Sequence, residues 1–304
     1  MIRPLLDRFT EATGIEVRLV SGKEDVLLER LKSEGQNSPA DVLLTADAGR
    51  LYRALEADVL QSVHSDILDT LIPAQYREPN GYWYALSLRA RPIIYAIGRV
   101  DPQELKDYEG LTNEKWRDRI CVRSSSSIYN QSHIASMIAH HGIAAAESWA
   151  EALVSNFARK PGGGDRDQIR AVASGECDIA LANTYYLAQL ASSENAEDQA
   201  VAAAVAIIWP NQDGVGTHVN VSGAAVTASA KNLTNAVKLI EFLVGDEAQE
   251  LYAKSVYEYP IRDGLAAAPL VASWGAFKAD DLDLSLLGKY NAEAVRIADR
   301  VGWP

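Results

Sequence analysis

Cysteine and long apolar runs are both scarce in this chain of 304 residues, which contains only two cysteines. Cys121 and Cys177 are too few to build a metal cluster by themselves, and either one disulfide or two buried thiols would fit them. No apolar stretch approaches the roughly 20 residues that a membrane-spanning helix needs. The sequence therefore predicts a globular protein that does not itself span a membrane.

Positive charge is scarce too, because 29 Lys and Arg stand against 41 Asp and Glu, for a formal net charge of -12. Nucleic-acid binding depends on clustered Lys and Arg, and the sequence has no such run. The HExxH, GxSxG and GxxxxGK[ST] motifs are also missing, which removes the commonest zinc-protease, α/β-hydrolase and P-loop interpretations. We therefore expect no nucleic-acid partner and no enzymatic activity.

What the sequence does contain is an alternation of helical and strand-like apolar patterns. Strand-like patterns occur at 15–20, 41–44, 120–123, 179–182, 202–209 and 224–227. Helical patterns occur at 4–13, 26–31, 48–57, 133–141, 144–157, 168–174, 236–244 and 248–253. This alternation predicts an α/β fold with mostly parallel sheets covered on both faces, and the length suggests about two domains. The glycine-rich segment 160–165 looks flexible.

Tyrosines follow two of the expected strands. Tyr129 comes after the strand at 120–123 and a run of four serines, and Tyr185 and Tyr186 come after the strand at 179–182. Ligands of open α/β sheets bind beyond the carboxyl ends of strands, where helix N-termini also point. The three tyrosines are therefore candidates for one shared site, although any single tyrosine is far more often a packing residue.

Phenolate is a hard, anionic oxygen donor. Its free pKa near 10 means that only a strong Lewis acid holds it deprotonated at neutral pH. Fe3+ is such an acid and prefers hard oxygen ligands. Three phenolates would also neutralise a trivalent ion. The chemistry fits Fe3+, but the spacing alone does not establish it.

An ordered set of short blocks over nearly the whole chain resembles the periplasmic ferric-ion-binding proteins of bacterial iron ABC transporters. These blocks are PADVLLT at 39–45, LRAR at 88–91, CVRS at 121–124, SIYNQS at 127–132, ARKP at 158–161, DRDQ at 165–168, GECD at 175–178, NTYY at 183–186, GTH at 216–218 and SG at 222–223. Each block alone is weak, but their order is specific. The resemblance implies a type II periplasmic binding protein with two lobes, a hinge and an interlobe cleft that holds iron.

The resemblance also implies site residues. Tyrosines at the positions of Tyr129, Tyr185 and Tyr186 ligate Fe3+ in the family. A carboxylate stands in some members where Asp47 stands here, which makes Asp47 a secondary candidate ligand.

A synergistic anion such as carbonate is implied as well, with Arg89 as the first candidate contact and Arg91 and Ser127 beside it. Similar proteins carry cysteines that match Cys121 and Cys177, so a disulfide is expected to clamp the two strands that lead to the tyrosines.

The expected lobes comprise 1–93 with 219–304, and 94–218, the second carrying the tyrosines. Family members begin with a strand and a Tyr-Ser loop before their first helix, whereas this sequence begins in that helix. We therefore expect the first strand, its loop and the signal peptide to be missing from the sequence as given, together with any ligands that the loop supplies.

The implied function is to bind Fe3+ in the periplasm and deliver it to an inner-membrane ABC permease, as a monomer. One alternative is a two-lobed protein that binds a small anionic or organic ligand through Arg89, Asn183 and the serines at 124–127. A second is a cytoplasmic α/β enzyme that uses Cys121 or an acidic pair, and it predicts free thiols.

Overall fold

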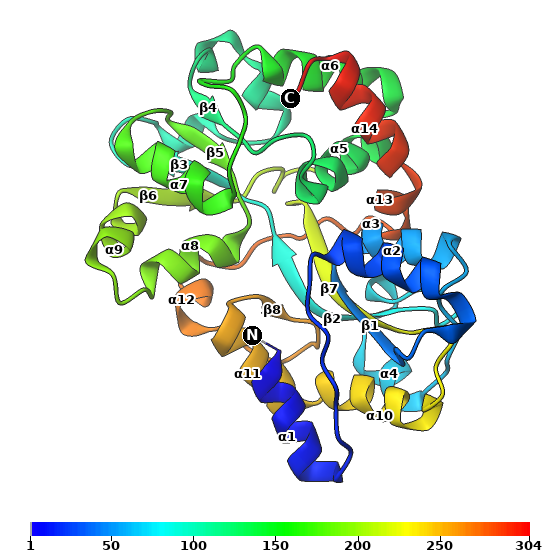
Figure 1. Cartoon of the computed structure of the whole chain (residues 1–304). Helices are drawn as coiled ribbons and strands as arrows, with labels where there is room; N and C mark the ends of the chain where they lie inside the picture. The colour runs from blue at the N-terminus through cyan, green and yellow to red at the C-terminus, as the bar shows by residue number, and fades with distance from the viewer. Residues whose placement is uncertain (1) are drawn as a thin grey trace. The chain divides into compact units, whose positions relative to one another are not determined.

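The computed structural model describes residues 2–304 (Figure 1). The chain divides into two compact α/β units. Unit 1 comprises the residues up to Leu88 together with Asn220–Pro269, and unit 2 comprises Arg89–Val219 together with Leu270–Pro304. The chain therefore passes between the units more than once, and each unit is built from segments far apart in sequence.

Unit 1 is organised around a four-stranded sheet in the order β1-β7-β2-β8. Its strands are β1 (Val42–Ala46), β2 (Tyr84–Ala90), β7 (Val219–Val226) and β8 (Tyr259–Pro260). Every residue of β2 and of β7 is buried, as expected for central strands that are covered on both faces. Its helices are α1 (Arg3–Thr13), α2 (Glu24–Glu34), α3 (Ala48–Glu56), α4 (Asp66–Leu71), α10 (Leu233–Leu243) and α11 (Asp246–Val256).

Helix α1 shows how local sequence sets an element of unit 1. Its first turn contains a proline, and Gly14 ends it with a left-handed φ of 72°. Leu5, Leu6 and Phe9 form its buried face, and the ring of Phe9 meets that of Phe242 in α10 edge to face at 5.5 Å. Figure 1 shows this blue helix beside α10 and α11. The apolar period thus places α1 against helices more than 200 residues away.

Unit 2 has a second sheet in the order β4-β5-β3-β6. Its strands are β3 (Ile93–Ala96), β4 (Ile120–Cys121), β5 (Ile179–Leu181) and β6 (Val205–Ile208). Its helices are α5 (Ile128–His141), α6 (Ile143–Val154), α7 (Asp165–Ser174), α8 (Thr184–Ala191), α9 (Ala196–Ala203), α13 (Ser285–Lys289) and α14 (Asn291–Arg300). Helix α12 (Pro269–Ala272) lies at the boundary of the units. Short 3-10 helices occupy Gly35–Asn37, Ala74–Tyr76, Pro102–Glu104, Glu109–Thr112 and Glu114–Trp116.

The C-terminal segment packs differently from the sequence prediction, which gives all of 219–304 to the first lobe. Residues 270–304 belong to unit 2 instead. Helix α14 buries Ala294, Ile297 and Ala298 and lies against α5 and α6, as the red and green helices of Figure 1 show. An amphipathic helix pattern indicates that one face is buried but not which element buries it. The predicted boundary between the lobes therefore differs from the boundary between the units.

The prediction of mostly parallel sheets is wrong. Among the pairings described, β1 with β7, β2 with β8, and β3 with both β5 and β6 are antiparallel, whereas β4 with β5 is parallel. The strands β2 and β7, which carry the chain between the units, occupy the middle of the first sheet. Antiparallel neighbours do not need the helical crossover that joins parallel strands, so an alternation of helical and strand-like patterns does not by itself determine strand direction.

The strand predicted at 15–20 does not form. This segment follows Gly14 as irregular backbone, and none of the described pairings supplies it with a neighbouring strand. A strand requires ladder hydrogen bonds as well as an alternating pattern. Across residues 2–304, no helix combines the length and the apolar character that a membrane crossing requires.

Candidate functional site

The parallel pair β4 and β5 sets the position of the tyrosines in unit 2. Cys121 of β4 lies opposite Ala180 of β5, so both strands end at the same edge of the sheet. Helix α5 begins at Ile128 after the first strand, and α8 begins at Thr184 after the second. Tyr129 lies in the first turn of α5, and Tyr185 and Tyr186 lie in the first turn of α8, so the two first turns lie together.

The three tyrosine side chains meet at this edge. The hydroxyl oxygens of Tyr129 and Tyr185 lie 3.1 Å apart. The rings of Tyr185 and Tyr186 lie 4.2 Å apart between centroids, with an interplanar angle of 36°. Burial, and next the charge of Tyr129, raise the pKa of the Tyr186 phenol. The convergence is internal to unit 2.

Guanidinium groups surround Tyr129. The Cζ atoms of Arg89 and Arg123 each lie 5.2 Å from the centroid of its ring. A cation over an aromatic ring is attracted by the ring quadrupole. Arg89 is buried, with 2% of its surface exposed. The pair provides a positive environment for an anionic oxygen.

Arg91 contacts residues next to the tyrosines and is also buried, with 1% of its surface exposed. Its Nη2 donates to Asn130 Oδ1 at 2.6 Å, and its Nη1 donates to Asn183 Oδ1 at 3.1 Å. Nη2 also donates to the carbonyl oxygen of Leu181 at 3.2 Å. The guanidinium is thus hydrogen-bonded to residues of both tyrosine-bearing turns.

Asp165 supplies a fully buried carboxylate near this arginine, with Oδ2 3.9 Å from Arg91 Nη1. Its Oδ1 lies 3.9 Å from Arg123 Nη1, and its Oδ2 accepts a hydrogen bond of 3.4 Å from the backbone N–H of Asn183. Burial raises the pKa of Asp165, and the charge of Arg91 opposes that effect. A buried carboxylate needs such partners.

Ser127 precedes the first turn of α5 and is the N-cap of that helix. Its side chain is buried, and within residues 2–304 its Oγ makes no hydrogen bond. A helix N-terminus favours anions because its first N–H groups lack intrahelical partners. Ser127 therefore presents a donor that an anionic ligand could use.

Asp47 belongs to unit 1, where it is the N-cap of α3. Its Oδ1 accepts from the backbone N–H of Gly49, and its Oδ2 accepts from Asn220 Nδ2, both at 2.9 Å. The side chain is fully buried. Both carboxylate oxygens already have a hydrogen-bond donor, which suits a capping residue.

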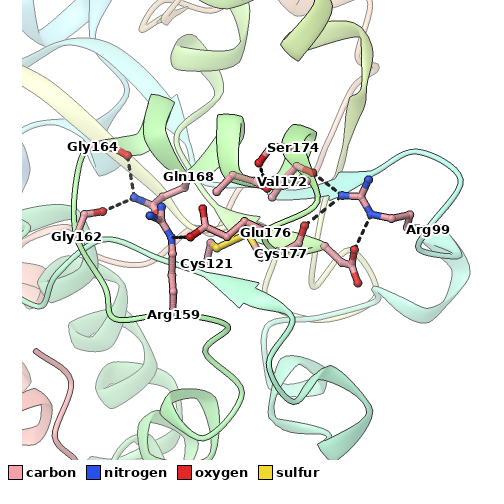
Figure 2. Close-up of a disulfide and its surroundings, with 12 residues drawn as sticks. Arg99, Cys121, Arg159, Gly162, Gly164, Gln168, Val172, Ser174, Glu176 and Cys177 are labelled. Carbon is pink, nitrogen blue, oxygen red and sulfur yellow. Dashed lines mark hydrogen bonds and ion pairs between the residues drawn. A yellow bond between two sulfur atoms is a disulfide. The ribbon is translucent and has the colours of Figure 1, made fainter.

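A disulfide joins Cys121 and Cys177, with Cα atoms 6.0 Å apart (Figure 2), and no free cysteine occurs among residues 2–304. Cys121 ends β4, and Cys177 lies two residues before β5. Figure 2 also shows Arg99 reaching the carbonyl oxygens of Val172 and Cys177. The disulfide thus connects the two strands that lead to the tyrosines, the pairing expected from the family resemblance.

The glycine loop before α7 is tied down, although its sequence predicts flexibility. Gln168 is fully buried, and its Nε2 donates to the carbonyl oxygens of Gly162 and Gly164 at 2.6 and 3.0 Å (Figure 2). This holds the segment that leads into Asp165.

The C-terminal segment also holds the serine loop before Tyr129. Trp303 Nε1 donates to the carbonyl oxygen of Arg123 at 3.0 Å. The backbone N–H of Ser125 donates to the carbonyl oxygen of Pro304 at 2.8 Å. The Trp303 ring packs edge to face on Phe157 at 5.2 Å. Residues 303–304 therefore fix the path from β4 into α5.

Sequence reasoning did not find the parts played by Asn130, Asp165 and Arg123. Asn130 directly follows Tyr129, but its contact with Arg91 depends on the tertiary arrangement. Asp165 carried only a weak signal, as a charge beside a glycine loop. Among residues 2–304, no group of three His, Cys, Asp or Glu side chains is placed to hold a metal ion.

The model of the bacterial extracellular solute-binding protein family matches residues 37–279, well over half of the chain. The chain belongs to this family. It is 50% identical over 299 residues to Iron uptake protein A1 of Synechocystis sp. (strain ATCC 27184 / PCC 6803 / Kazusa), covering 98% of this chain and 83% of that protein. This solute-binding protein is thus part of a transport family, and the enzyme alternative is wrong.

Two solved structures have folds similar to that of this chain. A Trichodesmium protein described as IdiA or FutA, in complex with iron and citrate, is 50% identical with a TM-score of 0.97, over 100% of this chain and 96% of that one. A ferric binding protein from Campylobacter jejuni is 39% identical with a TM-score of 0.95, over 99% of this chain and 96% of that one. The two-unit α/β architecture of this solute-binding protein is that of two-lobed ferric-binding proteins.

Proposed function

We propose that this solute-binding protein captures Fe3+ in the periplasm through the phenolates of Tyr129, Tyr185 and Tyr186 and delivers it to the permease of an ABC transporter. The observation that carries the proposal is the meeting of the Tyr129 and Tyr185 hydroxyls at 3.1 Å in the first turns of two helices. The names of the related proteins, Iron uptake protein A1 and ferric binding protein, support ferric iron as the bound ion.

The chemistry of the donors supports Fe3+ over softer or less charged ions. Phenolates are hard oxygen donors, and three of them balance the charge of a trivalent ion. Arg89 and Arg123 place positive charge beside the Tyr129 ring, which suits a site for anionic oxygen donors. The positive surroundings also limit the repulsion between phenolates that share one metal.

A synergistic anion is the second part of the proposal. Arg89 and the buried Oγ of Ser127 are its contacts, near the N-terminus of α5. Carbonate or a small carboxylate has the required charge and acceptor oxygens, and citrate accompanies iron in the Trichodesmium structure. Asp47 is the further candidate ligand, and an Asp47→Asn variant tests its contribution.

The test is an Fe3+ titration of the metal-free protein, followed through the visible phenolate-to-iron charge-transfer band. The double variant Tyr185→Phe/Tyr186→Phe should lose the band and weaken iron binding by more than the ~10–100-fold that loss of a supporting contact costs. Tyr290→Phe, in the same unit but outside the cluster, is the matched control and should bind as the wild type does. Undiminished iron binding by the double variant would refute tyrosine ligation. Calorimetry of metal-free protein with sulfate, phosphate and small carboxylates tests the alternative of an anionic cargo.

A further inference from the structure

Arg91 donates hydrogen bonds to residues that flank both groups of tyrosines. Its Nη2 binds Asn130, the neighbour of Tyr129, and its Nη1 binds Asn183, the N-cap of α8. Asn130 in turn donates through Nδ2 to the carbonyl oxygens of Arg123 and Ser124, at 2.8 and 3.2 Å. The contacts run from one arginine into both first turns.

The backbone of Arg91 is itself fixed. Its N–H donates to the carbonyl oxygen of His218 at 3.0 Å, and its carbonyl oxygen accepts from the Tyr108 hydroxyl at 2.7 Å. A planar guanidinium on an anchored backbone offers several donors in a rigid fork. It can therefore hold two acceptors at a fixed separation, which a flexible ammonium cannot do.

We infer that Arg91 is a positioning residue, which sets the first turns of α5 and α8 relative to each other and so sets the spacing of Tyr129 from Tyr185 and Tyr186. The inference deepens the proposed function and rests on it. It replaces the anion contact that the family resemblance implies for Arg91. Both Nη atoms of Arg91 already donate to protein acceptors, and the side chain is only 2% exposed.

Asp165 completes the device by balancing the buried charge. It lies 3.9 Å from Arg91 and accepts from the backbone N–H of Asn183. Arg91 and Asp165 thus both bind Asn183, Arg91 through the asparagine side chain and Asp165 through its backbone N–H. A buried arginine without a carboxylate nearby would carry a large desolvation cost.

The experiment compares Arg91→Lys with Arg99→Lys. Both variants keep the positive charge and lose the fork. Arg99 also bridges three groups of unit 2, Asp178 and the carbonyl oxygens of Val172 and Cys177, but none belongs to a tyrosine-bearing turn. Arg91→Lys should weaken Fe3+ binding by about 10–100-fold, the usual effect of losing a group that orients a metal ligand, and should shift the charge-transfer maximum. Arg99→Lys should match the wild type in both.

Titrations at several bicarbonate concentrations separate positioning from anion binding. A positioning role predicts that the deficit of Arg91→Lys stays constant as bicarbonate rises. A deficit that bicarbonate abolishes would assign Arg91 to the anion and overturn the inference, as would wild-type affinity with an unshifted band.

Hydrogen exchange of the metal-free protein gives a readout that does not depend on iron. Arg91→Lys should speed amide exchange in the first turns of both α5 and α8, whereas Arg99→Lys should not. Unchanged exchange overturns the inference whatever the iron result. A wild-type protein without a charge-transfer band removes tyrosine ligation alone, and the exchange data still decide whether Arg91 orders the two turns.

Two further variants keep the test decisive if Arg91→Lys does not fold. Asn130→Ala and Asn183→Ala each remove one acceptor and leave Arg91 paired with Asp165. Each should shift the band and weaken iron binding, and the double variant should lose less than the product of the two single losses, because either change already breaks the bridge. Two single variants with the wild-type band would overturn the inference.

Discussion

Removing the disulfide should weaken unit 2 substantially. The perturbation is the double variant Cys121→Ala/Cys177→Ala, which opens a loop of 56 residues in sequence separation. The loop contains α5, α6 and α7. In the chain-entropy description, closing a loop of this length lowers the entropy of the unfolded chain enough to stabilise the folded state by about 4 kcal/mol at 25 °C.

The buried contacts of the two cysteine side chains add to the stability that the double variant loses. Cys121 and Cys177 are 1% and 3% exposed and lie in an apolar cluster with Ile169, Val172 and Ala180. Truncation to alanine therefore also removes buried contacts. Reduction of the wild type keeps the sulfur atoms in place and isolates the effect of the cross-link from that of the lost volume.

Denaturant unfolding followed by tryptophan fluorescence is the appropriate assay. Five of the six tryptophans, at 116, 149, 209, 274 and 303, lie in unit 2, so the signal reports mainly on that unit. The midpoint should fall in the double variant and in the reduced wild type, and reductant should leave the double variant unchanged. A loss of less than about 1 kcal/mol, with the slope of the transition unaltered, would refute the loop-entropy reasoning.

Three further predictions concern pH and backbone. Fe3+ binding should weaken as pH falls, by up to about tenfold per pH unit for each phenol that must lose its proton; chelator competition at pH 8 and pH 6 measures this, and a flat profile would contradict phenolate ligation. Burial lowers the pKa of His218 to about 3, so below its unfolded value of about 6.5 the unfolded chain binds a proton that the folded chain does not. The free energy of unfolding of unit 2 should then fall by up to about 1.4 kcal/mol per pH unit on acidification. Denaturant unfolding of the wild type and of His218→Asn at pH 7 and pH 5 tests this, because the variant should lose less stability. Gly216 has a φ of 100°, and a Cβ there would lie 2.7 Å from the backbone of Ala279. Gly216→Ala should therefore lower the melting temperature more than Gly142→Ala, which shares a positive φ but meets no atom within 4 Å.

Local patterns predicted much of the fold because many elements follow local rules. The helix that ends at Gly14, the helix that ends at Gly175 and the short strand at Val42–Ala46 lie where the apolar pattern and the glycines indicate. Strands β2 and β3 were not predicted, because β2 is a mainly apolar segment interrupted by Ser87 and Arg89, and β3 is a short apolar segment directly after Arg91 and Pro92. No local signal distinguishes such a segment from a buried helix.

The sequence predicted the tyrosines of the candidate site but not the residues that position them. Tyrosines that follow two strand ends carry a recognisable signal, and the register of β4 with β5 brings those ends together. The bridge from Arg91 to Asn130 and Asn183 joins residues 39 and 92 positions apart. Such contacts arise only after the chain has packed, and sequence spacing does not encode them.

The return of residues 270–304 to unit 2 has a consequence for biosynthesis. A ribosome or export channel delivers the chain from its N-terminus, so β4, β5 and all three tyrosines emerge well before Trp303. Until residues 303–304 arrive, the carbonyl of Arg123 and the amide of Ser125 lack the partners that hold the approach to α5. The nascent protein should therefore pass through a stage in which β4, β5 and the tyrosines are present but the segment between β4 and α5 is not yet held by residues 303–304.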